Sequence, residues 1–324
     1  MKENNSQNPG WLVVINPNAG RRKGLVDWEE ISGYLRKYGL NFTPVFTERP
    51  EHATEIVIEY VERDKFRKIV VVGGDGTMNE VVNGIFRQKQ FSTTEISLGM
   101  ITVGTGNDWG RMFGIPGDYN EAIKVLTGNQ TFIQDAGEVS FCNANEPGNR
   151  YFVNIAGMGF EAAVVQRTNK LKEKGKGGAF LYLFNIFTSL VNYKHVEAMI
   201  SVDGLDMENK IFNINVGIGK YGGGGMMPSP NAILDDGLFD LTIIRKLSKP
   251  RVILNLKRLY NGTIHKHPKV DSYTGKSIRV ESADTIHLET DGENLGHTPI
   301  EFSIIPKSVR VFTGNAPMES IPAF

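Results

Sequence analysis

Short apolar runs alternate with helical patterns in the first part of the chain. Ile69 to Val72 is a run of four β-branched residues, which is typical of a parallel strand buried on both faces. From Met78 to Phe86 apolar residues recur at the spacing of one helical face. Comparable runs predict strands at 11–15, 41–47 and 96–102 and helical faces at 25–35 and 53–61. Repeated strand–helix units predict a doubly wound, mainly parallel α/β sheet with ligands at the carboxyl ends of its strands.

From about residue 137 apolar and polar residues alternate instead, which indicates a mainly antiparallel β-sandwich domain. We therefore expect an α/β nucleotide-binding domain over 10–136, completed by 308–324, and a β-sandwich substrate domain over 137–307. A final strand at 308–313 would return to the first domain. In the second domain we expect strands at 152–155, 198–202, 211–216, 239–244, 277–280, 286–289 and 300–305, and helices at about 161–172 and 250–261.

Two glycine turns that contain an acid follow predicted strands. Gly73 to Gly76 surround Asp75, and the second turn runs from Gly104 to Asp108. A strand, a glycine turn and a helix N-terminus together form a phosphate cradle. The alternative for the first turn is a tight connection in which Thr77 and Glu80 form a capping box. The basic run Arg21 to Lys23 after the first strand could contact phosphates or be a solvated turn.

Two clusters of carboxylates lie in the second half. Asp235-Asp236-Gly237 would suit a divalent cation with oxygen ligands, or an Asp-Gly turn between two strands. Asp291-Gly292-Glu293 is open to the same two interpretations: it could be a turn, or it could present a carboxylate that accepts the proton of an attacking hydroxyl.

Composition and charge narrow the function. The chain has 36 Lys and Arg against 36 Asp and Glu, so it has no positive field for a nucleic-acid partner. The single Cys142 allows no internal disulfide and fits a cytoplasmic protein.

The polar first ten residues are no secretion signal, and the apolar run 179–191 is too short for a transmembrane segment. The lysines in 170–176 would suit an anionic membrane surface or a solvated loop.

Two common nucleotide motifs fail on their context. Gly217 to Gly222 matches G-x-G-x-x-G, but further glycines and then Pro228 and Pro230 follow it, so no helix can begin there. No Walker A sequence occurs. Both a dinucleotide oxidoreductase and a Walker-type ATPase are therefore disfavoured.

With these motifs in hand, the chain resembles the bacterial lipid kinases of the diacylglycerol kinase catalytic-domain family. The resemblance rests on NPNAG at 16, GGDGTMNEVVNG at 73, GTGND at 104, GGGMMPSPNAILDDGLFD at 223 and DGE at 291, in the family's order. The family is related to sphingosine and ceramide kinases and, more distantly, to NAD kinases and phosphofructokinases. The resemblance implies a nucleotide-binding α/β domain, a β-sandwich domain, and ATP in the cleft.

The resemblance also implies roles for single residues. Asp75 and Asp108 would lie near the phosphates and their Mg²⁺. Asp236, with the carbonyl groups of Ile233 and Leu238, would hold a second, structural Mg²⁺. Glu293 would be the general base, with Asp291 as its neighbour or competitor. The nucleotide site would be lined by Asn16, Pro17, Asn18, Ala19, Gly20, Thr47, Gly74, Asp75, Gly76, Thr77, Met78, Asn79, Glu80, Thr105 and Asp108.

We therefore expect a cytoplasmic kinase, peripheral at the inner face of the membrane, that transfers the γ-phosphoryl group of ATP to the primary hydroxyl of a lipid. Diacylglycerol is the default acceptor, which would give phosphatidic acid. A sphingoid base or ceramide is the alternative, and a non-catalytic nucleotide- or lipid-binding module or an NAD kinase ranks lower. A homodimer is left open.

Overall fold

A computed structural model describes residues 9–104, 106–144, 146–172, 188–191 and 193–314; within 169–172 it describes the backbone alone. The chain forms two compact units. Of the described residues, 9–133 and 309–314 form the α/β unit, and 134–308 form the β unit. The chain therefore enters the β unit after Ile133 and leaves it after Ser308, while residues 315–324 fall outside the described part.

The α/β unit is built on a parallel sheet in the order β2-β1-β3-β4. The end of β14 pairs parallel to β4, with Arg310 opposite Ser97. The predicted parallel sheet and the predicted strand at 308–313 are thus confirmed. The strands are β1 (Trp11–Ile15), β2 (Phe42–Phe46), β3 (Lys68–Gly73), β4 (Ser97–Thr102) and β14 (Glu293–Phe312).

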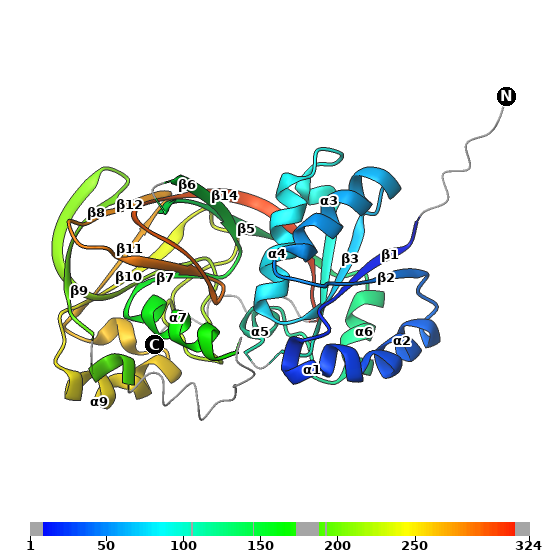
Figure 1. Cartoon of the computed structure of the whole chain (residues 1–324), viewed down its shortest axis with the longest axis horizontal. Coiled ribbons are helices and arrows are strands. Elements are labelled where there is room, and N and C mark those ends of the chain that lie inside the picture. The colour runs from blue at the N-terminus through cyan, green and yellow to red at the C-terminus, as the bar shows by residue number, and fades with distance from the viewer. Residues whose placement is uncertain (1–8, 105, 145, 173–187, 192, 315–324) are drawn as a thin grey trace. The chain divides into compact units, whose positions relative to one another are not determined.

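Helices cover both faces of this sheet, α3 and α4 on one and α2 and α6 on the other (Figure 1). Alternate residues of β1 and β3 pack with Ile31, Leu35 and Ile123 on the second face. Cover on both faces is why β1, and β3 from Ile69 to Val72, are apolar. The helices are α1 (Ala19–Val26), α2 (Trp28–Lys37), α3 (His52–Asp64), α4 (Asp75–Arg87), η1 (Thr93–Glu95), α5 (Asp108–Met112) and α6 (Tyr119–Thr127).

The β unit is a strongly bent sheet in which long strands change partners along their length. β9 pairs with β8 through its first half and with β7 and β10 through its second. β14 pairs with β13 and then with β12, and β12 returns to β8. The pairing therefore closes a ring through β7, β9, β8, β12, β14 and β13. Phe152, Phe239 and Phe302 pack together within this unit.

The elements of the β unit are β5 (Thr131–Asn143, from Gln134 on), β6 (Glu146–Phe152), β7 (Ile155–Gly159), α7 (Phe160–Lys172), β8 (Val196–Val202), β9 (Leu205–Gly217), β10 (Phe239–Arg245), α9 (Lys249–Tyr260), η2 (Ile264–Lys266), β11 (Val270–Gly275), β12 (Ser277–Glu281), β13 (His287–Thr290) and β14 up to Ser308. Both predicted helices are present, as α7 and α9.

Two sequence expectations for the β unit are wrong in part. The strand expected at 152–155 is a bend at Val153 and Asn154 between β6 and β7, because the backbone N–H groups there bind a carboxylate described below. The strands β5, β6 and β11 were not expected from the pattern. Among the described residues, no helix is long and apolar enough to cross a membrane.

Candidate active site

Three turns of the α/β unit meet at the carboxyl ends of β1, β3 and β4. The N–H of Asn16 donates to the carbonyl of Val72 at 3.0 Å, and that of Val103 donates to Gly73 at 3.0 Å. Thr47 joins them from the end of β2, since its N–H donates to Ile15 at 2.8 Å. The loops expected to line the nucleotide site are therefore brought together at one edge of the sheet.

Glycine lets these turns pack backbone against backbone. A Cβ on Gly104 would lie 2.9 Å from the Cα of Gly74. A Cβ on Gly20 would lie only 1.7 Å from the carbonyl oxygen of Val103, and Gly20 has a positive φ of 59°. No side chain fits at either contact. The glycines of NPNAG, GGDGT and GTGND therefore hold the turns at a distance that other residues cannot reach.

Asp75 joins the two glycine turns through its carboxylate. It is the first residue of α4, and its two oxygens accept the N–H groups of Asp108 at 3.2 Å and Trp109 at 3.0 Å. Asp108 is itself buried. A Cβ built on Gly106 would lie 3.1 Å from Oδ2 of Asp75 and 3.4 Å from Oδ2 of Asp108. Two carboxylates therefore converge on one point that is left open only because residue 106 is glycine.

The side chains around GGDGT hold the turn rather than cap the helix. Helix α4 begins at Asp75 with Gly74 as its N-cap, so the alternative interpretation, a capping box of Thr77 and Glu80, is wrong. Thr77 instead accepts a hydrogen bond from Nδ2 of Asn16 at 3.0 Å. Glu80 accepts the N–H of Ala53 at 3.1 Å and thereby ties α4 to α3.

The other residues expected at the nucleotide site differ in where their side chains lie. Met78 and Asn79 are buried inside α4, so their side chains face the core. Asn18 donates its N–H to Oδ1 of Asn16, which shapes the NPNAG turn of Asn16, Pro17, Asn18, Ala19 and Gly20. Gly76 lies in the first turn of α4. Thr105 lies outside the described residues.

The Asp291-Gly292 pair forms the two-residue turn of the β13–β14 hairpin. Thr290 pairs with Glu293, and both turn residues have positive φ, 49° and 86°, as a type I′ turn requires. The carboxylate of Asp291 accepts the N–H groups of Val153, Asn154 and Ile155 at 3.1–3.2 Å. Asp291 is buried, whereas the side chain of Glu293 is exposed. The two candidate bases are therefore in different environments.

A buried acid that sequence reasoning missed lies beneath this turn. Glu289 accepts the N–H of Gly292 at 2.9 Å. Burial raises its pKa well above the ordinary value, and the neighbouring Glu161 carboxylate raises the pKa further. Glu161 in turn accepts a hydrogen bond from Asn213 and donates its own N–H to the Asn213 side chain. The pattern gave no signal for this burial, because in Ile286 to Thr290 the residues alternate and Glu289 falls on the polar side with His287.

The Asp235-Asp236-Gly237 turn is anchored by another acid that sequence reasoning missed. Asp135 is fully buried and accepts the N–H groups of Gly237 and Lys307, both at 2.7 Å. Oδ1 of Asp236 accepts the N–H of Leu238 at 3.0 Å. Burial, and then the charge of Asp235, raise the pKa of Asp236. The residues before this turn form no strand, so the expected turn between two strands is wrong on one side.

The expected cation ligands at this turn are one carboxylate and two backbone carbonyl groups. Asp236 supplies its carboxylate, and Ile233 and Leu238 flank it in sequence with their carbonyl groups. In the described part of the chain, no three His, Cys, Asp or Glu side chains cluster as a metal site. A cation here would therefore depend on backbone carbonyls as well as on Asp236.

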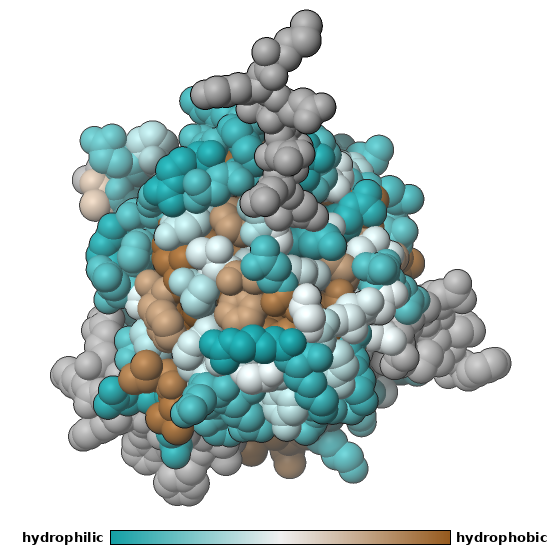
Figure 2. Space-filling model, turned by 90° about the vertical axis from the view of Figure 1, so that its right-hand side faces the viewer, coloured by the Kyte–Doolittle hydropathy of each residue, from teal (hydrophilic) through white to brown (hydrophobic). Residues whose placement is uncertain are grey.

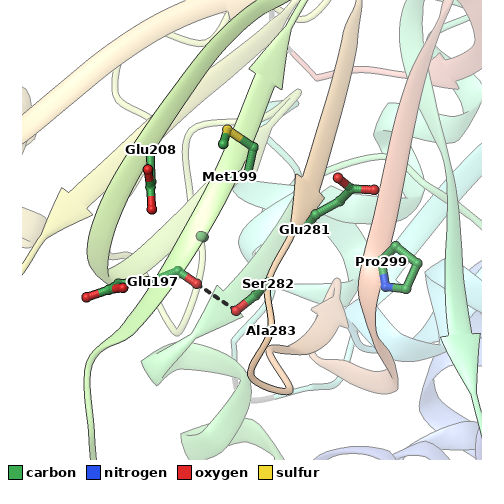
Figure 3. Close-up of a pocket in the computed structure, with 8 residues that line it drawn as sticks. Glu197, Met199, Glu208, Glu281, Ser282, Ala283 and Pro299 are labelled. Atoms are coloured by element: carbon green, nitrogen blue, oxygen red, sulfur yellow. Dashed lines mark hydrogen bonds between the residues drawn. The ribbon is translucent and has the colours of Figure 1, made fainter.

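Two hollows of the surface lie apart from all these residues. One, of about 460 Å³, is flanked by Glu197, Glu208 and Glu281 of β8, β9 and β12 (Figure 3). Its acidic lining would repel a phosphate. The other, of about 350 Å³, lies at the amino ends of β1 and β3 beside Trp11, Tyr38 and Lys68. Seen from the side of the α/β unit, apolar residues gather near the centre of a hydrophilic rim (Figure 2).

The lysine segment 170–176 remains a prediction. Lys174 and Lys176 lie outside the described residues, and for Lys170 and Lys172 the structure describes only the backbone at the end of α7.

The fold is an α/β domain, with three turns gathered at its strand ends, joined to a mainly β domain. Residues 10–139 match the diacylglycerol kinase catalytic domain, and 154–313 match the YegS C-terminal NAD kinase beta sandwich-like domain. A diacylglycerol kinase of Staphylococcus aureus (strain bovine RF122 / ET3-1) is 30% identical over 303 residues, which cover 94% of this chain and 92% of that protein. The chain therefore belongs to the bacterial diacylglycerol kinase family of lipid kinases and is a kinase.

Solved structures share the fold. A diacylglycerol kinase structure from Bacillus anthracis str. Sterne has a TM-score of 0.70 at 21% identity and covers 95% of this chain and 98% of its own. Yeast NADH kinase complexed with NADH has a TM-score of 0.51 at 14% identity and covers 95% and 85%. The predicted fold class, an α/β domain followed by a β-sandwich domain, is confirmed by the family matches.

Proposed function

We propose that this kinase transfers the γ-phosphoryl group of ATP to the primary hydroxyl of diacylglycerol and releases phosphatidic acid. The observation that carries the proposal is the convergence of Asp75 and Asp108 over Gly106, at the strand ends where α/β folds bind phosphates. Relatives named diacylglycerol kinase at 30% identity favour that acceptor. The phosphoryl transfer would take place at the cytoplasmic face of a membrane, where ATP and the lipid are both present.

The donor set at Gly106 fits a hard divalent cation. Two carboxylate oxygens face one small space, and such oxygens are the ligands that Mg²⁺ prefers. Asp75 and Asp108 would hold the ion, directly or through water. When bound, Mg²⁺ would neutralise charge on the β- and γ-phosphate oxygens.

The backbone of the turns would bind and orient the phosphates. The N–H groups at the start of α4 have no partner within the helix, and a helix N-terminus favours negative charge. Arg21, Arg22 and Lys23 are exposed directly after NPNAG, where they would add positive charge. Gly74 leaves the backbone open to close approach.

Glu293 would accept the proton of the attacking hydroxyl. The lipid oxygen forms a bond to the γ-phosphorus as the bond to the bridging oxygen breaks, ADP leaves, and the hydroxyl proton passes to the carboxylate. Asp291 is less suited to this role, because its oxygens already accept three backbone N–H groups. It would hold the turn that presents Glu293.

A second, structural Mg²⁺ would be held by Asp236 with the carbonyl groups of Ile233 and Leu238. The residues fit because Asp236 folds back onto the N–H of Leu238 and Asp135 fixes Gly237. These hydrogen bonds fix the conformation of the turn. A cation would offset the repulsion between Asp235 and Asp236, which raises the pKa of Asp236.

The test is incubation with γ-labelled ATP and a panel of separate acceptors: diacylglycerol, ceramide, a sphingoid base and NAD. Label in phosphatidic acid, at a rate at least tenfold above any other product, is expected. Preferred labelling of ceramide or the sphingoid base would overturn the acceptor but keep the lipid kinase. ATP binding without transfer to any acceptor would indicate a non-catalytic module and overturn the proposal.

A further inference from the structure

The segment that contains α9 is strongly basic in a chain of zero net charge. Residues 246–269 contain no Asp or Glu. Their cations are Lys246, Lys249, Arg251, Lys257, Arg258, Lys266 and Lys269. In the part of the chain that the structure describes, none of the seven forms an ion pair. The acidic residues that the structure describes therefore do not neutralise their positive charge.

Helix α9 packs on the β unit by one face only. Val252 is buried and packs in a cluster with Ile244, Leu247 and Ile264. Pro250 lies in its first turn and Asn261 ends it, so the helix is well delimited. Figure 1 shows α9 at the edge of the β unit, on the same side of the strands as α7. Apart from Val252, the residues from Arg251 to Tyr260 are exposed or half-buried.

That outer face is apolar at its centre. Leu254 is 78% exposed, Tyr260 55% and Ile253 43%. Ile253, Lys257 and Tyr260 follow one another at i, i+4 and i+7, which places them along one line of the helix. Leu254 lies beside this line. Exposed apolar residues interspersed with cations in this way are unusual for a surface that meets only water.

The segment around Val191 extends the same surface. The ammonium group of Lys249 donates to the backbone carbonyl of Val191, whose side chain is 65% exposed. Arg258, by contrast, is partly buried and donates to Asn255 and to the carbonyl of Thr263. Arg258 therefore supports the helix C-terminus, whereas Lys246, Arg251, Lys257, Lys266 and Lys269 are exposed.

We propose that the outer face of α9 docks onto an anionic membrane surface, with Leu254 and Tyr260 at the acyl boundary and the flanking cations on the lipid headgroups. A nucleic acid would match the charge but not the exposed leucine and isoleucine. A lipid surface matches both, because apolar side chains enter the bilayer boundary while Lys and Arg stems extend to the phosphates. The inference draws on the proposed function only in that the acceptor is a membrane lipid.

The test measures binding of the full chain to vesicles of phosphatidylcholine with phosphatidylglycerol, by co-sedimentation, against vesicles of phosphatidylcholine alone. Each cation near an anionic surface contributes roughly fivefold to partitioning. The Arg251→Gln, Lys257→Gln variant is therefore expected to bind about 25-fold more weakly. Lys37→Gln, Lys89→Gln removes two exposed charges from the α/β unit and serves as the matched control, expected to change binding less than threefold.

A second pair of variants tests the apolar contribution. Leu254→Asn is expected to weaken vesicle binding at least fivefold, whereas Leu205→Asn, at a site 60% exposed in the same unit, serves as its control. Equal binding by the α9 variants and their controls would overturn the proposal. So would wild-type protein that binds nucleic acid or an acidic protein but not the anionic vesicles.

Activity separates this inference from the proposed function. With a short-chain, water-dispersed diacylglycerol, the α9 variants are expected to turn over within twofold of the wild type, and to lose at least tenfold only when the acceptor is embedded in vesicles. An equal loss on both acceptors would overturn the docking role. A wild type inactive on every acceptor would overturn the proposed function alone, since vesicle binding is measured independently.

Discussion

The same pair of residues, Asp followed by Gly, does different work in the two units. At Asp75-Gly76 the chain enters a 13-residue helix, and the carboxylate bridges to the start of α5 with one side facing the space over Gly106. At Asp291-Gly292 the chain reverses in a hairpin, and the carboxylate is enclosed by three backbone N–H groups. An Asp between a strand and a helix lies at the carboxyl end of the strand, where a ligand can approach it. In the hairpin, by contrast, the hydrogen bonds from the bend at Val153 and Asn154 and from Ile155 enclose the Asp carboxylate.

This difference separates two kinds of acid. Asp75 and Asp108 converge where a cation and phosphates would fit, so we infer that their charges serve the reaction. Asp291 stabilises the turn, so we expect its loss to lower the free energy of unfolding more than the rate of the reaction. Glu293 directly follows the turn and is exposed, so we infer that its carboxylate serves the reaction.

The sharpest way to break this comparison is to change Asp75. Asp75→Ala removes the carboxylate from the proposed cation site, and we expect kcat to fall by roughly 10²–10³ or more. The same change removes the acceptor for two N–H groups of α5, at a cost of about 1 kcal/mol. Asp75→Asn retains one acceptor oxygen, so it should lose nearly as much activity with less loss of stability.

Turnover of labelled ATP and urea unfolding, measured on the same preparations, check both effects. If Asp75→Asn keeps more than a tenth of the wild-type kcat, the carboxylate is architectural like Asp291, and the contrast between the two units disappears.

The next effect in size concerns Glu293. Glu293→Gln keeps the shape and removes the base, and we expect kcat to fall roughly 10²-fold, at the low end for general bases because proton transfer is late in a loose transition state. Its unfolding midpoint should match the wild type, because the side chain is exposed. Near-normal turnover of folded Glu293→Gln would contradict the assignment.

The parts of the molecule that could be predicted from the sequence are those where local pattern and burial agree. β1, and β3 from Ile69 to Val72, are apolar because both faces of the sheet are covered, and the glycine turns after them mark the strand ends. The bend at Val153 and Asn154 could not be predicted, because it depends on Asp291, 137 or more positions away. Asp135 was missed for the same reason, because Gly237 and Lys307, whose N–H groups it accepts, are far from it in the sequence. Glu289 bonds the nearby Gly292, but its burial beside Glu161 depends on the fold.

Asp291 should affect stability more than chemistry. Asp291→Ala leaves the N–H groups of Val153, Asn154 and Ile155 without their acceptor in a buried place, and we expect a loss of about 3 kcal/mol in the free energy of unfolding. Asp291→Asn keeps the oxygen that receives two of the three bonds and should lose about 1 kcal/mol. Urea unfolding gives both values. The activity of each variant, corrected for its folded fraction, should stay within tenfold of the wild type; a 100-fold loss in folded Asp291→Asn would make Asp291 the base.

The smallest effect is a pH dependence from Glu289, which lies under the same turn. Burial and Glu161 raise its pKa in the folded state, so its favourable contribution is fully present below the unfolded pKa of about 4.3 and is lost as the pH rises through the folded value. Glu289→Gln can still accept the N–H of Gly292 but carries no charge. The variant should therefore gain stability relative to the wild type between pH 4 and pH 8, by about 2–4 °C in Tm. Glu161→Gln, which removes the neighbouring charge, should flatten the wild-type pH dependence in part. A difference between wild type and Glu289→Gln that does not change with pH would show that Glu289 stays in one protonation state, and that the hairpin of the β unit holds its acids without the mutual repulsion inferred here.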